Sequence, residues 1–409
     1  MKIERMELMP GVWLTAVRAE HRKGDVLSLQ LLSPLREETA TLNALLPPLL
    51  RRGTARLPDR EQLDHELDDL YGASITPTVR RRGEVQCLGF VARLPRQELV
   101  PEGISSVERG AALLGELLLH PATRSARLRQ DDVYATRAAL TQALRDRRRE
   151  EDAYVRRRLL EEMCRGEAAA VCPWGVEKRS EKVTVARLFS QYQTLLERAD
   201  VELFYCGAET PQRLELAVRE ALMGLPRASA RYDLVTETAR PAYDGPREIT
   251  ENTAGRELAA LGYRLGFGRD DALFPALLVV VHALKSQLKE TAQVTLLEGK
   301  GILRIVCPRE NRPQVEEAVS RLKWNDIDAS EVLSARAGVR DALLDALDDA
   351  AKLEALWLAD CAAGEVFAPE SLLAQVEQVT DGQFYAAAQE LLLDTAFTLV
   401  RPQEGGDRR

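Results

Sequence analysis

The sequence has little of what metal and redox sites usually require. It holds four histidines in 409 residues, and none of its six cysteines belongs to a C-x-x-C pair. Cysteines scattered in this way, in a chain with no sign of secretion, are expected to be reduced thiols rather than disulfides or a structural zinc site. A redox motif and a cysteine-based metal site are therefore excluded.

Long apolar runs and an excess of positive charge are missing as well. The longest apolar run, Ala272 to Leu284, has 13 residues, which is short of the roughly 20 that a membrane span needs. The net charge of −8 provides no basic excess to neutralise phosphates, which argues against a nucleic-acid partner. The charged start, Met1 to Glu7, has no apolar segment behind it, so a cytoplasmic location without membrane contact is expected.

What is present is enough chain for two domains of about 200 residues each. Residues 224–246 are rich in Pro, Ala and Arg without periodicity, and are expected to link a first domain, 1–223, to a second, 247–409. Each domain shows alternating strand patterns and amphipathic helical patterns.

A weak internal repeat supports this division. The segment Leu160–Cys164 has an echo in Leu356–Cys361, and the pattern from Val183 to Leu203 recurs about 196 positions later, from Val379 to Leu399. A repeat of this length indicates two copies of one α+β domain rather than a solenoid. The predicted fold is therefore α+β, with two tandem homologous domains, each a mixed sheet with flanking helices.

Two local patterns carry specific expectations. Residues 37–52 read as a helix, but Pro47 and Pro48 each remove a backbone donor, so this helix is expected to kink or to begin at Pro47. Residues 73–79 and 84–93 read as two strands of a hairpin, joined by a charged turn at 80–83.

The stretch from Thr41 to Thr54 carries the most specific resemblance. In length and flanks it resembles the zinc-binding helix of the insulinase/pitrilysin metallopeptidases, the inverzincins, whose signature is H-x-x-E-H. Counting back from the Gly-Thr pair that ends the stretch, the two histidines would fall at Ala44 and Pro48, and the general base at Pro47. None of these three side chains can bind zinc or transfer a proton.

The resemblance places the third zinc ligand, a glutamate on a later helix, at Ala143, and the glutamate seven residues before it at Thr136. A catalytic zinc needs three protein ligands and an open position for water. With all three ligands and the base replaced, the resemblance implies a protein without zinc, without a cofactor and without peptidase activity.

Three short runs are similar to a non-catalytic bacterial branch of this family: Ala44–Pro47, Leu70–Ala73 and Glu162–Cys164. Members of that branch are encoded beside an intact H-x-x-E-H relative and are associated with modification of elongation factor P. The resemblance implies a non-catalytic subunit that forms a heterodimer with an active insulinase-like peptidase and encloses a peptide or protein ligand; a homodimer is the alternative.

Two other functions remain open at this stage. One is a binding or scaffold module in elongation factor P modification, which rests on the branch resemblance alone. The other is a zinc-dependent peptidase with an atypical site, which would need at least two histidines within reach of one metal, and the spacing offers none.

The densest charge run lies between Arg145 and Asp152 and continues with the arginines 156–158. Opposite charges three or four residues apart on a helix pair with each other, so a solvated and self-paired face is the first expectation. A docking surface for an acidic partner is the alternative.

Overall fold

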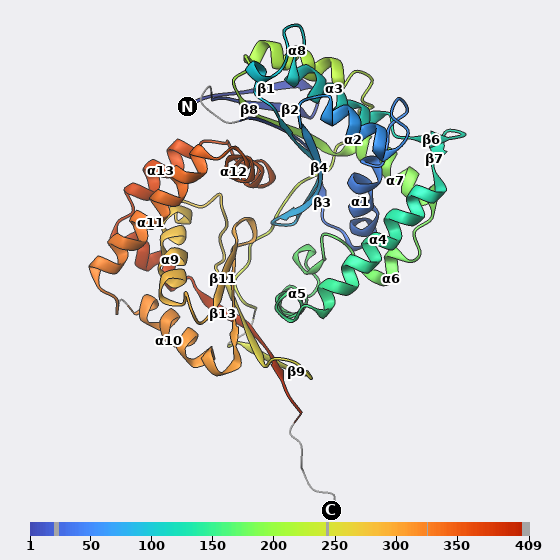
Figure 1. Cartoon of the computed structure of the whole chain (residues 1–409). Helices are drawn as coiled ribbons and strands as arrows, with labels where there is room; N and C mark the ends of the chain where they lie inside the picture. The colour runs from blue at the N-terminus through green and yellow to red at the C-terminus, as the bar shows by residue number, and fades with distance from the viewer. Residues whose placement is uncertain (20–23, 243–244, 325, 403–409) are drawn as a thin grey trace, which may run out of the picture.

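The structure, a computed structural model, describes residues 1–19, 24–242, 245–324 and 326–402. Each half of the chain forms a mixed β-sheet with helices packed against it (Figure 1). The expected α+β class with mixed sheets is confirmed.

The first sheet has the strand order β1-β2-β8-β3-β5-β4. Strands β2 and β8 run parallel, and the other neighbours are antiparallel. Its strands are β1 (Lys2–Met9), β2 (Val12–Arg18), β3 (Asp25–Pro34), β4 (Ser74–Arg82), β5 (Val85–Leu94) and β8 (Asp200–Gly207). A separate ribbon pairs β6 (Thr123–Arg124) with β7 (Arg127–Leu128).

The second sheet repeats this topology. Its order is β11-β12-β10-β13-β9, and β9 and β13 form its parallel pair. Read from β4 to β2, the first sheet matches it strand for strand, and β1 is an addition at the edge. Its strands are β9 (Arg247–Asn252), β10 (Leu258–Arg264), β11 (Gln293–Leu297), β12 (Ile302–Pro308) and β13 (Leu392–Val400). This correspondence agrees with the repeat in the sequence.

The helices follow the same division. Those before residue 224 are α1 (Glu37–Leu50), α2 (Arg60–Asp68), α3 (Ser106–Leu119), α4 (Gln130–Arg149), α5 (Glu151–Met163), α6 (Glu177–Ser180), α7 (Val185–Arg198) and α8 (Pro211–Ala221). Those after residue 246 are α9 (Phe274–Gln287), α10 (Arg312–Lys323), α11 (Ala329–Asp348), α12 (Ala350–Ala363), α13 (Pro369–Glu377) and α14 (Asp381–Gln389). Short 3-10 turns are η1 (Gln97–Leu99), η2 (Ala168–Ala170), η3 (Glu298–Lys300) and η4 (Arg309–Asn311).

One helix of each half packs on the sheet of the other half. Helix α5 packs on β10 and β13 of the second sheet, where Val155 and Leu159 lie against Phe397. In return, α12 packs on β3 and β8 of the first sheet, where Trp357 lies against Phe204 with ring centroids 5.1 Å apart (Figure 1). These are the helices that carry the repeated Leu160–Cys164 and Leu356–Cys361 segments, so the exchange follows the repeat.

The halves are also joined by a buried ion cluster. The Lys300 side chain is 1% exposed, and its Nζ lies 2.7 Å from carboxylate oxygens of both Glu84 and Glu167. Arg264 of β10 pairs with Glu167 and, at 3.0 Å, with Asp394. A buried cation with two carboxylate partners holds its neighbours in one arrangement, because any displacement leaves a charge unpaired.

The segment 224–246 contains no helix or strand among its described residues. It contacts the first half through Thr236, whose Oγ1 accepts from the Glu84 backbone N–H at 3.0 Å. Its role as a linker, with domain limits at 223 and 247, stays a prediction.

Helix α1 passes through Pro47 and Pro48 without a break, so the alternative in which it begins at Pro47 is wrong. The two prolines deprive the carbonyls of Asn43 and Ala44 of their helical donors. Ten of the fourteen residues of α1 are buried. Burial on this scale outweighs the local cost, because most helix stability in proteins comes from packing.

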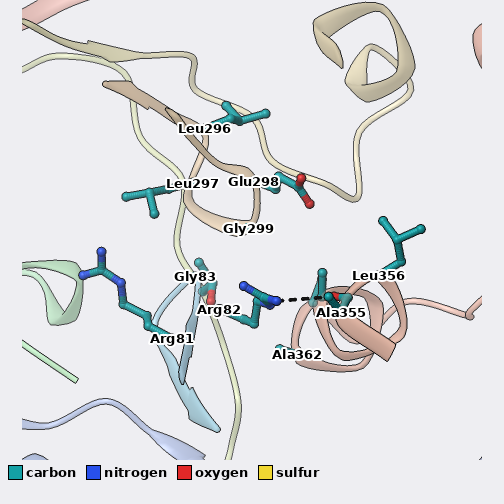
Figure 2. Close-up of a pocket in the computed structure, with 13 residues that line it drawn as sticks. Arg81, Arg82, Gly83, Leu296, Leu297, Glu298, Gly299, Ala355, Leu356 and Ala362 are labelled. Atoms are coloured by element: carbon teal, nitrogen blue, oxygen red, sulfur yellow. Dashed lines mark hydrogen bonds between the residues drawn. The ribbon is translucent and has the colours of Figure 1, made fainter. Parts of the chain in front are cut away.

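The hairpin between β4 and β5 is tighter than expected. The residues Arg80 to Arg82 continue the strand β4, and the turn is reduced to Gly83 and Glu84. Because side chains alternate along a strand, Arg81 points to the opposite face from its two neighbours. Figure 2 shows Arg82 directed at Ala355 of α12 and Arg81 directed away from that helix.

Candidate functional site

The positions expected for the degenerate zinc site lie on two helices that pack together. Ala44, Pro47 and Pro48 are on α1, and Ala143 is on α4. The helices are antiparallel, because Arg52, just after α1, pairs at 2.8 Å with Asp132 in the first turn of α4. Ala44 and Pro47 are buried, Pro48 is half-buried and Ala143 is exposed. The assignment of these residues to ligand positions stays a prediction.

The described residues contain no group of three or more His, Cys, Asp or Glu side chains placed to hold a metal ion. His65 lies on the exposed side of α2 beside Asp69, at 3.1 Å. Within the same described part of the chain, no helix is long and apolar enough to cross a membrane.

A buried amide network, which the sequence gave no sign of, fixes the first half of α1. Asn43 donates to Gln86 on β5 at 2.9 Å and accepts from Gln191 on α7 at 2.8 Å. Gln86 in turn donates to the carbonyls of Ala40 and Pro173, at 3.1 and 2.5 Å. Helix α1 is thus held by neutral amides, which satisfy each other's buried hydrogen-bonding groups.

The segment 172–176 covers the start of this helix. The Val176 N–H donates to Thr41 Oγ1 at 3.3 Å, and Gly175 lies against Thr41 with a φ of +76°. The next residue back, Trp174, stacks under Arg147 of α4, whose guanidinium carbon is 3.7 Å from the ring centroid. Ala44 is 2% exposed, so its side chain packs inside the first half of the chain.

Beside this cover lies a cavity of ≈ 520 Å³ between the two halves. Residues of β4, α4, α5 and the segment 170–174 form its first-half wall, and Leu297 and Arg304 belong to the second half. The lining is dominated by arginines: Arg80, Arg81, Arg82, Arg147, Arg148, Arg156, Arg157 and Arg304. We call this space the arginine cavity.

Two of the arginines in this cavity are buried, where a charged side chain costs free energy. Arg81 donates to the Ala169 carbonyl at 2.8 Å, and burial lowers its pKa. Arg304 makes no hydrogen bond or ion pair through its side chain among the described residues, and its Nε is buried without a partner. Burial first, and then repulsion from Arg81 and Arg156, lowers the pKa of Arg304 to about 10. Both guanidinium groups remain cationic at neutral pH.

The sequence did not predict that Arg81 and Arg304 lie close together, because the two residues belong to different halves of the chain. The charge run on α4 and α5 did point to the same region. Arg147 and Arg156 line the cavity, whereas Arg145 faces away and pairs with Glu177 and Glu181.

No protein-family model matches the chain. Among curated proteins, it is similar to the probable inactive metalloprotease YmfF of Bacillus subtilis (strain 168), with 24% identity over 95% of this chain and 96% of that protein.

Solved structures with the same fold include members of the M16, or insulinase-like, peptidases. A conserved protein from Enterococcus faecalis V583 superposes with a TM-score of 0.86 and 20% identity, over 99% of this chain and all of that one. A peptidase M16 inactive domain from Pseudomonas fluorescens gives a TM-score of 0.76 and 13% identity, over 98% of each chain. The periplasmic protease PqqL from Escherichia coli gives 0.72 and 15%, over 98% of this chain and 48% of that one. The resemblance read from the sequence is confirmed at the level of the fold.

Proposed function

We propose that this chain, an inactive homologue of the insulinase-like peptidases, is the non-catalytic half of a two-chain peptidase or processing complex. Its partner would carry an intact H-x-x-E-H helix and supply the zinc and the general base. This chain would supply the opposite wall of a chamber around a peptide. In this proposal Ala44, Pro48 and Ala143 stand where the zinc ligands would be, and Pro47 stands where the base would be.

One observation carries the proposal. The insulinase-like fold is intact over nearly the whole chain, while the described residues offer no set of side chains that could hold the metal. Alanine and proline have no ligand atom, so no rearrangement of α1 restores a zinc site. The name of the Bacillus subtilis relative, a probable inactive metalloprotease, supports the same conclusion.

The size of one neighbour supports a partner of similar fold. This chain matches 48% of the PqqL protease, and 92% of a structure of its first half alone. That protease therefore carries a second half for which this chain has no counterpart. A separate active chain would fill that place, whereas a homodimer of this chain would still have no zinc.

The test is to measure metal and activity in the purified chain. Elemental analysis is expected to find far less than one zinc per chain, and unstructured peptides are expected to stay uncut. One equivalent of zinc, or peptide cleavage that a chelator abolishes, would contradict the proposal.

The elongation factor P alternative rests on the sequence resemblance alone, and identifying the natural partner separates the two functions.

A further inference from the structure

The arginine cavity is positively charged, although the chain as a whole carries a net negative charge. The protein carries a net charge of −8, with 64 acidic and 56 basic residues. Yet eight arginines line the cavity, and Glu150 is its one acidic residue. A concentration of one sign in a recess with low-dielectric walls focuses the field there and attracts ligands of the opposite sign.

Most of these arginines have no carboxylate of the protein to neutralise them. Arg80 is paired with Glu354 at 2.6 Å, and Arg157 with Glu161 at 3.5 Å. The described residues place no carboxylate within 4.0 Å of the other six: Arg81, Arg82, Arg147, Arg148, Arg156 and Arg304. In the rest of the fold, by contrast, arginines are widely paired, as Arg145 and Arg158 are.

The two halves contribute arginines to the same space. Arg81 extends from the end of β4 and Arg304 from β12, and the two are close enough to repel each other. Burying a cation without a counter-charge costs free energy, so the fold maintains this arrangement at the expense of its stability. A bound anion would remove the cost, and the guanidinium fork is shaped to hold a carboxylate through two hydrogen bonds.

The rest of the lining is apolar, with side chains that include Leu144, Leu160, Val171, Pro173 and Trp174. A volume of ≈ 520 Å³ is within the range of pockets that enclose a ligand of many atoms. The mixture of uncompensated arginines and apolar side chains fits a peptide that carries carboxylates between apolar residues, better than it fits a small inorganic anion.

We propose that the arginine cavity binds acidic peptide segments, through carboxylate contacts to Arg81, Arg147, Arg148, Arg156 and Arg304. This assignment names the ligand class of the chamber described above, and it rests on that proposed function. It also gives a purpose to three arginines of the charge run on α4 and α5, because Arg147, Arg148 and Arg156 line the cavity without a carboxylate partner.

The test is fluorescence anisotropy with the full-length chain and a labelled peptide of alternating Glu and Leu. The matched probe is the same peptide with Gln in place of Glu. The Glu peptide is expected to bind and the Gln peptide not to bind, and added salt should weaken the complex. The R147Q/R148Q variant should raise the Kd by about tenfold, because it removes two exposed cationic contacts to the peptide carboxylates.

The matched control is R145Q/R149Q, which removes the same charge from the same helix outside the cavity lining. It is expected to leave the Kd unchanged. Equal binding of the Gln peptide, an equal loss in both variants, or tighter binding of a single-stranded oligonucleotide than of the Glu peptide would overturn the assignment.

Capture of the natural partner by the unaltered chain, together with its binding of the Glu peptide, distinguishes this assignment from the proposed function. If the partner is recovered but the Glu peptide does not bind, the ligand class is wrong and the subunit role stands. If the Glu peptide binds but no insulinase-like partner is found, the subunit role is wrong.

Discussion

Arg80 on β4 and Glu354 on α12 form a two-armed ion pair between the halves, with 2.6 Å between donor and acceptor on each arm. Ser28 on β3 donates to the same carboxylate at 2.7 Å. Glu354 is 3% exposed, so its charge is held by these contacts and not by water. The pair fixes α12 on the first sheet and neutralises one arginine of the cavity wall.

Replacement of Glu354 by Ala should therefore destabilise the whole chain. It leaves the Arg80 guanidinium without its partner between two packed elements, and we expect the free energy of unfolding to fall by about 3 kcal/mol. Urea denaturation measures the change. The exposed pair Glu98–Arg96 provides the control, because Glu98→Ala should leave the midpoint unchanged. Equal midpoints for the two variants would show that the pair does not join the halves.

Replacement of Arg304 by Leu should have the opposite effect on stability. Burial lowers its folded pKa to about 10, below the ordinary value of an arginine, so the unfolded chain holds this proton more tightly. The penalty is therefore complete below about pH 10 and shrinks as the pH rises above that value toward the pKa of the unfolded chain.

At neutral pH we expect Arg304→Leu to raise the free energy of unfolding by about 1 kcal/mol and to weaken binding of the Glu peptide. Arg145→Leu is the control, since this arginine is exposed and paired with two glutamates. Thermal denaturation and anisotropy on the same samples give both quantities. A loss of stability in Arg304→Leu would mean that this arginine is satisfied in the fold.

The sequence predicted the elements well where signals are local. The hairpin expected at residues 73–93 forms as β4 and β5, and the repeat pointed to two sheets of one topology. The exchange of α5 and α12 could not be predicted, because an apolar helix face does not specify which of two similar sheets it covers. The sequence left open whether α1 begins at Pro47 for a related reason: proline propensity is local, whereas the burial that outweighs it is not.

The candidate site, too, could be predicted only in part from the sequence. Spacing rules predicted that the charge run pairs along its helices, and Arg158 does pair with Glu161 and Glu162. The rules failed for Arg147, which stacks on Trp174. Contacts between elements distant in sequence decide which arginines face a cavity, and residue spacing carries no information about them.

The cover over α1 depends on Gly175. A Cβ at this position would lie 2.0 Å from Thr41 Oγ1, and the residue has a φ of +76°. Gly175→Ala should lower the free energy of unfolding by about 2 kcal/mol or more and expose the segment 172–176 to proteases.

Gly166→Ala is the control for Gly175→Ala, because Gly166 has a φ of +89° but nothing within 4 Å of an added Cβ. The Gly166→Ala variant therefore has the strained backbone conformation but no steric clash at its new Cβ. Limited proteolysis should therefore cut the Gly175 variant in this segment and spare the Gly166 variant. Identical digests would mean that the segment does not pack on Thr41 in solution.

The assignment of the degenerate positions predicts a gain of function. A variant with Ala44→His, Pro48→His and Ala143→Glu restores three ligands on α1 and α4, and we expect it to take up about one zinc per chain. Removing Pro48 also returns a backbone donor to the helix, which favours folding. The variant without the Ala143→Glu change should bind zinc more weakly. A folded triple variant without zinc, by elemental analysis and circular dichroism, would show that the positions are wrong.

The identity of the natural partner decides whether this chain is the inactive half of a two-chain complex. The measurement is affinity purification of the chain from its native cell, followed by mass spectrometry of the proteins recovered with it. We expect an insulinase-like protein with an intact H-x-x-E-H motif in nearly equal amount. Recovery of the chain alone, or with a translation factor and its modifying enzyme, would contradict it.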